Sequence, residues 1–76
     1  MKIKDIKVGH TYVNRGKGRT RRKVLAIGFE HRPSEYWSMN EPPNDDGVLY
    51  EQSGAGGVHQ RRLYISSFAK WCGREV

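Results

Sequence analysis

The chain has 76 residues and a net charge of +6. A chain this short buries only a modest fraction of its surface, so any active-site cavity must be shallow. A core of this size seldom contributes more than about 3 to 5 kcal/mol to the free energy of unfolding, so support from a partner subunit is expected. No apolar run approaches the roughly 20 residues of a membrane span, no segment resembles a signal peptide, and the lone Cys72 cannot form an internal disulfide. We therefore expect one soluble domain over residues 1–76, located in the cytoplasm.

The charge is segregated along the chain. Residues 1–29 hold nine Lys or Arg and one Asp, for a net charge of +8. Residues 30–51 hold one Arg and six acids, for a net charge of −5, and residues 52–76 return to +3. Such asymmetry is typical of proteins with a polyanionic partner, although a basic pI also describes many small proteins that bind no anion.

The first third of the chain predicts a hairpin. Residues 1–10 predict an extended lead-in and Thr11–Asn14 a short strand. Gly16 and Gly18 are predicted to supply the positive-φ positions of a tight or bulged turn. Residues 22–29 form the strongest strand pattern, which places Leu25, Ile27 and Phe29 on one face and Val24, Ala26 and Gly28 on the other. Because both faces are apolar, we expect this strand to be central.

The middle of the chain predicts a long loop followed by a second hairpin. Residues 31–47 contain three prolines and the turn-forming run Asn44-Asp45-Asp46-Gly47, which excludes regular structure over most of the segment. A loop of this length is usually functional or disordered. Residues 48–52 and 62–65 predict two further strands, joined by a flexible glycine-rich stretch.

Residues 66–73 predict a short helix. A serine N-cap stands at its start, Phe68, Trp71 and Cys72 have helical spacing, and Gly73 stands where the helix is expected to end. Because two turns of helix are not stable alone in water, Phe68 and Trp71 must pack on the sheet.

These elements predict a mainly β fold with a short C-terminal helix. The expected forms are a small SH3-like barrel or a strongly curved antiparallel sheet of four to five strands, with an OB-like barrel and a plain meander as alternatives. The residues IKVGHTY, a glycine turn and RRKVLAIGF resemble the opening hairpin of SH3-like barrels of the KOW and Tudor types. This resemblance implies the barrel form and is confined to the first hairpin.

The tail carries a second resemblance. VLYEQ, a glycine-rich gap and RLYISSFAKWCGREV are similar to the ends of small uncharacterised proteins encoded by bacteriophages and prophages. The resemblance implies a phage setting and therefore a bacterial host cell. It implies no activity and no functional residues.

A basic run of six side chains is the main candidate binding site. Its members are Arg15, Lys17, Arg19, Arg21, Arg22 and Lys23. Because alternate side chains of a strand share a face, Arg19 and Arg21 are expected to point together and Arg22 away from them. Neutralising three or four phosphates would make the logarithm of affinity fall with that of salt concentration at a slope of about −3. The alternative is a charged hairpin tip that serves solubility and protects an edge strand.

Aromatic residues divide into a loop pair and a core set. Tyr36 and Trp37 lie in the acidic loop, where a phosphate backbone is disfavoured, so we expect them to cover the open end of the barrel or to anchor a protein partner. The others are expected in the core or at its margin: Tyr12, Phe29, Tyr50, Tyr64, Phe68 and Trp71. For Tyr12, Tyr50 and Tyr64 the alternative is exposure on a sheet face that stacks bases.

No residue pattern indicates catalysis, a metal site or a cofactor. His10, His31 and His59 are scattered, and none has the ligand spacing of a zinc site. Asp45 and Asp46 lack the alternating oxygen ligands of a calcium loop and are expected in a turn. Cys72 is expected to be a small buried hydrophobe rather than a reactive thiol. We therefore expect a protein that is not an enzyme.

Three functional hypotheses remain open. The first is a binding module that contacts DNA or RNA phosphates, with little sequence specificity, through the basic N-terminal hairpin. The second is a phage accessory module that binds a host protein through the acidic aromatic loop, residues 30–51. In the third, the charge serves solubility alone. Oppositely charged poles also allow head-to-tail pairing of copies into a homo-oligomer.

Overall fold

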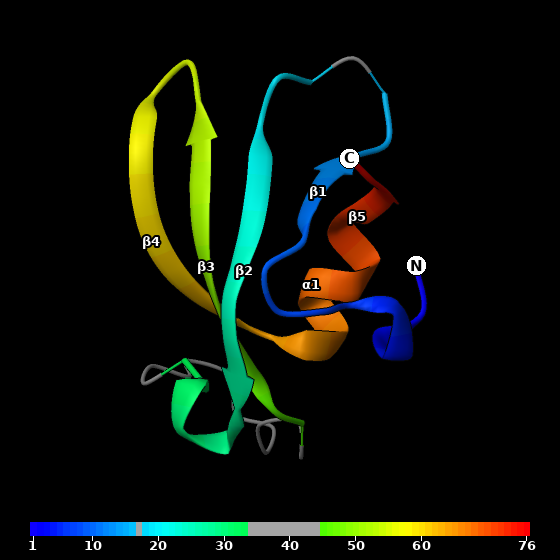
Figure 1. Cartoon of the computed structure of the whole chain (residues 1–76), viewed down its shortest axis with the longest axis vertical. Helices are drawn as coiled ribbons and strands as arrows, with labels where there is room; N and C mark the ends of the chain where they lie inside the picture. The colour runs from blue at the N-terminus through cyan, green and yellow to red at the C-terminus, as the bar shows by residue number, and fades with distance from the viewer. Residues whose placement is uncertain (17, 34–44) are drawn as a thin grey trace, which may run out of the picture.

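The computed structural model describes residues 1–16, 18–33 and 45–76. Its elements in chain order are η1 (Ile3–Asp5), β1 (Thr11–Asn14), β2 (Arg21–Gly28), η2 (Phe29–His31), β3 (Gly47–Gly54), β4 (Gly57–Tyr64), α1 (Ile65–Trp71) and β5 (Cys72–Glu75). The strands form one antiparallel sheet with the order β4-β3-β2-β1-β5, shown in Figure 1. The mainly β class is confirmed. Within the described residues, no pairing joins β4 to β5, so the sheet is not closed into a barrel and the open-sheet form is the one adopted.

The strand pairing assigns each side chain to one face of the sheet, because residues directly opposite one another in neighbouring strands point the same way. Arg22 lies opposite Tyr12 on β1 and Gln52 on β3. This face carries the core residues that α1 covers, and we call it the helix face. Arg21 lies opposite Val13 and Ser53 and points to the other face, which we call the open face.

The core lies between the helix face and α1. Its buried members are Ile6, Tyr12, Val24, Val48, Tyr50, Ile65, Phe68, Ala69 and Cys72. Phe68 is fully buried at the centre, with ring centroids 6.0 Å from Tyr12 and 5.2 Å from Tyr50. Tyr12, Tyr50 and Tyr64 are each 8% exposed or less, so the alternative that one of them stacks bases on an exposed face is wrong.

The predicted faces of β2 are wrong beyond Val24. The register with β3 shifts between Val24 and Ala26, so the alternation changes phase at this bulge. Val24 and Ile27 therefore both lie on the helix face, where Ile27 packs against the core. Phe29 leaves the strand for η2 and is 64% exposed, which overturns its predicted place in the core.

The second hairpin is confirmed, but it is longer than predicted. β3 and β4 pair without a break from Gly54↔Gly57 to Gly47↔Tyr64, so residues 58–61 continue the strand where a flexible stretch was expected. Residues 57–62 are exposed on both faces, which explains why they lack the apolar alternation of a half-buried strand.

The helix is confirmed, with different ends. It begins at Ile65, its N-cap position is Tyr64, and no side chain caps it, so the predicted serine cap is wrong. The Ile65 N–H instead donates to the Asp46 carbonyl at 2.9 Å. Within the described residues, no helix is long and apolar enough to cross a membrane.

Gly73 does not end the helix but lies in β5, a strand that the sequence pattern did not predict. A Cβ atom at this position would lie 2.6 Å from the backbone nitrogen of Arg15, which is shorter than any ordinary contact. Glycine is therefore required because β5 passes close to the end of β1, where the register between the two strands shifts.

The lead-in is folded onto β1. It contains the 3-10 turn η1 where only extended chain was expected, and the buried Tyr12 hydroxyl holds the segment. This hydroxyl donates to the Asp5 carbonyl at 2.9 Å and accepts the Lys7 N–H at 2.8 Å.

Of the predicted loop, His31 belongs to η2 and Gly47 to β3, and residues 34–44 lie outside the described residues.

Candidate nucleic-acid interface

The connection from β1 to β2 presents two exposed arginines, Arg15 and Arg19. Gly16 has a φ of +97° and supplies the left-handed position that the turn requires. Gly18 has no positive φ, so this part of the turn prediction is wrong. Lys17 lies outside the described residues.

The basic run divides between the two faces of β2. Arg21 and Lys23 are exposed on the open face, whereas Arg22 points to the helix face, as the strand alternation predicts. The six predicted site residues therefore do not form one continuous surface. Of the described members, Arg21 and Lys23 share the open face, and Arg15 and Arg19 lie in the β1–β2 connection.

Arg22 is held by contacts within the protein. Its guanidinium carbon lies 4.1 Å from the ring centroid of Trp71 and 4.8 Å from that of Tyr50. Its Nε–H donates to Gln52 Oε1 at 2.9 Å. Burial lowers the pKa of Arg22, and the nearby cation of Arg61 acts in the same direction. Arg22 thus links the helix to the sheet instead of joining the exposed cations.

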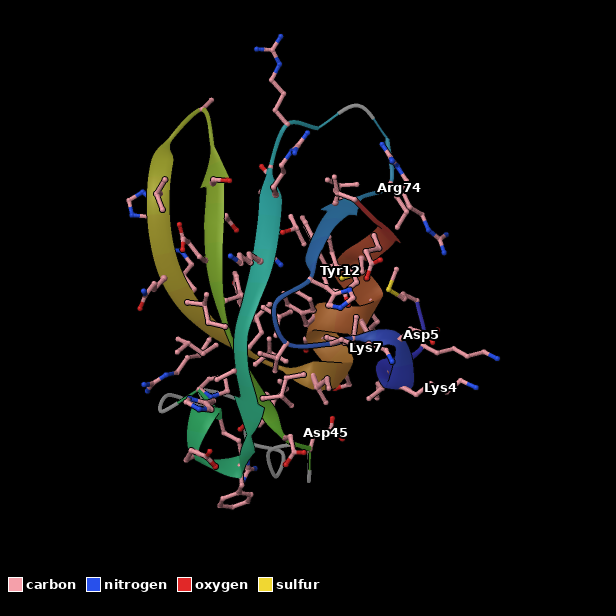
Figure 2. The ribbon with its side chains drawn as sticks, in the orientation of Figure 1. Lys4, Asp5, Lys7, Tyr12, Asp45 and Arg74 are labelled. Carbon is pink, nitrogen blue, oxygen red and sulfur yellow. The ribbon has the colours of Figure 1, made fainter. Side chains whose placement is uncertain are left out.

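Arg74 joins the open face from the other end of the chain. It lies opposite Val13 on β1, and Val13 lies opposite Arg21 on β2. The backbones of the two arginines are therefore separated by about 10 Å, twice the strand spacing. Figure 2 shows Arg74 at the same end of the molecule as the β1–β2 connection. Sequence reasoning missed Arg74 because β5 has no strand pattern. We define the basic surface as Arg15, Arg19, Arg21, Lys23 and Arg74.

No carboxylate of the described residues forms an ion pair with the basic surface. The two ion pairs within this part of the chain are His10–Glu75 and His31–Glu30, the latter at 3.6 Å. Glu75 thus pairs with a histidine although it is adjacent to Arg74 in sequence. Glu51 lies directly opposite Lys23 in the pairing of β2 with β3, without an ion-pair contact.

The other candidates from the sequence are an aromatic pair, Cys72 and possible metal ligands. Tyr36 and Trp37, the predicted partner-binding pair, lie outside the described residues. Cys72 is 1% exposed, and burial raises the pKa of its thiol to about 11, which confirms its place in the core. Among residues 1–16, 18–33 and 45–76, no group of three or more His, Cys, Asp or Glu side chains is placed to hold a metal ion.

Comparison of the chain with protein-family models, curated proteins and solved structures gives no match.

Proposed function

We propose that this protein is a non-enzymatic binding module that contacts DNA or RNA phosphates through the basic surface. The observation that carries the proposal is the shared open face of Arg21, Lys23 and Arg74, next to Arg15 and Arg19 in the β1–β2 connection. None of these five cations is paired with a carboxylate of the described residues.

Such a surface favours affinity over sequence specificity. Exposed Lys and Arg side chains on a sheet reach phosphates as mobile charges, and phosphate contacts carry no direct sequence information. With three or four phosphates neutralised, the logarithm of affinity falls against the logarithm of salt concentration with a slope of about −3.

The test is a fluorescence-anisotropy titration with labelled single-stranded and duplex oligonucleotides at several salt concentrations between about 50 and 200 mM. We expect binding at the lowest concentration and a steep loss at the highest. Absence of binding near 50 mM salt, or affinity that does not respond to salt, refutes the proposal.

A pair of double variants separates the basic surface from net charge. Arg21→Gln with Arg74→Gln removes two charges from the open face and is expected to reduce the salt slope by about 2. The matched control, Lys4→Gln with Lys70→Gln, removes two exposed charges from η1 and α1 and is expected to leave the slope unchanged. Circular dichroism is the check that both variants remain folded.

A second candidate function, binding of a host protein at the acidic segment, is favoured by Phe29. This aromatic side chain is 64% exposed in η2, directly before Glu30, the first residue of the acidic segment, and the Arg32 guanidinium carbon lies 4.5 Å from its ring centroid. Exposed aromatic residues are frequent anchors of protein interfaces. A nuclease-treated pull-down that captures a partner with the wild type and the Lys4→Gln control, but not with Phe29→Ala, would favour this candidate.

We place either activity in the cytoplasm of a bacterial host, in the phage setting that the tail resemblance implies.

A further inference from the structure

A second group of cations lies on the helix face, on the opposite side of the sheet from the basic surface. Arg22 on β2 and Arg61 on β4 both point to this face, because Arg22 lies opposite Gln52, and Tyr50, two residues along β3, lies opposite Arg61. The guanidinium carbon of Arg22 lies 4.8 Å from the centroid of the Tyr50 ring, and Arg61 is the residue opposite Tyr50 on β4.

The Arg22 guanidinium is oriented with one donor edge available. Its guanidinium carbon lies 4.1 Å from the centroid of the Trp71 ring, and its Nε–H donates to Gln52 Oε1. Neither Nη group has a hydrogen-bond partner among the described residues. The two Nη atoms together form the end-on fork that binds two oxygens of one anion, and here the protein already fixes the orientation of that fork.

The two like charges lack a counter-ion in the described part of the chain. Arg61 is close enough to disfavour the protonated form of Arg22, and neither arginine forms an ion pair with a described carboxylate. An anion between them would remove this repulsion and supply acceptors for the unused N–H groups.

We propose that Arg22 and Arg61 form a binding site for a phosphate group on the helix face, with Gln52 and Trp71 orienting Arg22. The site does not depend on the basic surface, since the two lie on opposite faces of the sheet. Its ligand is a free phosphate or a phosphate of a nucleotide chain, which have the same tetrahedral oxyanion chemistry.

Trp71 provides the readout because the guanidinium that would bind phosphate lies over its ring. The Trp37→Phe variant makes Trp71 the sole tryptophan. Inorganic phosphate is titrated into this variant at constant ionic strength, with chloride as the balancing anion. We expect a saturable change in Trp71 emission with a dissociation constant on the order of 1 to 10 mM, together with a shift of the Arg22 Nε–H resonance in a ¹⁵N spectrum.

Adjacent residues of β4 supply the matched control. In the Trp37→Phe background, Arg61→Gln is expected to raise the dissociation constant about fivefold, whereas Arg62→Gln, on the open face, should change it less than twofold. Arg22→Lys keeps the charge but loses the fork, so it is expected to weaken binding more than Arg62→Gln does. Arg61 is exposed, so Arg61→Gln tests the site even if Arg22→Lys alters folding.

A short oligothymidylate distinguishes the two sources of phosphate. If it changes Trp71 emission at lower concentration than inorganic phosphate in the Arg21→Gln, Arg74→Gln background, the site takes a nucleotide phosphate; otherwise it takes free phosphate. No response of either Trp71 or the Arg22 resonance up to about 50 mM phosphate overturns the site. An unchanged response in Arg61→Gln overturns it as well. Both results leave salt-dependent binding at the basic surface unaffected, so the two proposals fail separately.

Discussion

Arg21 and Arg22 are neighbours in the chain with different surroundings. Arg21 is exposed on the open face, while Arg22 is partly buried between Tyr50 and Trp71 and bonded to Gln52. A count of charges treats the two residues as equal. The strand alternation separates them, and the packing of α1 determines which of the two faces is covered.

Gly73 is a residue at which a single methyl group is expected to matter. Gly73→Ala places a Cβ atom 2.6 Å from the Arg15 backbone nitrogen, so the contact between β5 and β1 must open. We expect a loss of about 1 to 3 kcal/mol in the free energy of unfolding, measured by urea denaturation. Gly56→Ala is the control, because nothing lies within 4 Å of its Cβ position. Equal stability of the two variants would contradict the close approach of these strands.

Cys72 makes the stability of the protein depend on pH in the alkaline range. The thiol ionises at its ordinary pKa of 9.0 in the unfolded chain and at about 11 when buried in the fold. Between these values the unfolded state has lost a proton that the folded state keeps, so stability falls as pH rises from 9 to 11 and is unaffected below that range.

Urea denaturation at pH 8 and pH 11 tests this dependence. Between pH 8 and pH 11, the free energy of unfolding of the wild-type protein is expected to fall by on the order of 2 kcal/mol more than that of Cys72→Ala, which has no thiol. Parallel pH profiles for the two proteins would show that the thiol ionises freely in the folded state.

Among the elements, those with apolar alternation could be predicted from the sequence and those without it could not. β1 was predicted with its observed bounds, and β2 and β3 to within a few residues, because each buries part of one face. The outer half of β4 is exposed on both faces, so only pairing with β3 makes it a strand. β5 is four residues long and is a strand because β1 offers an unpaired edge, which local sequence does not encode.

The same limit applies to the candidate site. The basic run and the outward direction of Arg21 and Lys23 follow from residue type and strand period. Arg74 becomes part of the surface only through the pairing of β5 with β1, and Arg61 approaches Arg22 only through the register of β4. Long-range pairing of this kind has no local sequence signal.

The junction between η1 and β1 depends on one hydroxyl group. Tyr12→Phe removes the acceptor of the Lys7 N–H and the donor to the Asp5 carbonyl while the ring remains against Phe68. We expect a loss of about 1 to 3 kcal/mol in the free energy of unfolding and faster hydrogen exchange at Lys7. Tyr50→Phe is the control, since the Tyr50 hydroxyl has no hydrogen bond to a described residue. Similar losses in both variants would argue against this role for Tyr12.

At the scale of the whole molecule, the distance of an acid from the basic surface decides its effect on binding. Asp45 lies at the end away from Arg74, as Figure 2 shows, and the longest extent is 33 Å. At an ionic strength of about 0.1 M the Debye length is about 10 Å, so acids at the far end are screened from the basic surface. Only an acid close to the cations can weaken their attraction for a phosphate.

Two neutralised acids test this prediction. Glu51→Gln removes the carboxylate opposite Lys23 and is expected to strengthen oligonucleotide binding about threefold at about 0.1 M salt. Asp45→Asn removes the same charge at the far end and should leave the affinity unchanged within error. Equal gains from both variants would mean that net charge, and not its placement, controls binding.

The adjacency of β1 and β5 also has a kinetic consequence. The edge strand beside β1 is β5, about 60 residues later in the sequence, and the core contains both Tyr12 and Cys72. Pairings between distant segments form slowly, because the conformational entropy of loop closure is lost before the favourable contacts form. A ribosome translating this sequence therefore holds an unfinished sheet until synthesis has passed β5, and the protein acquires its native packing only after that point.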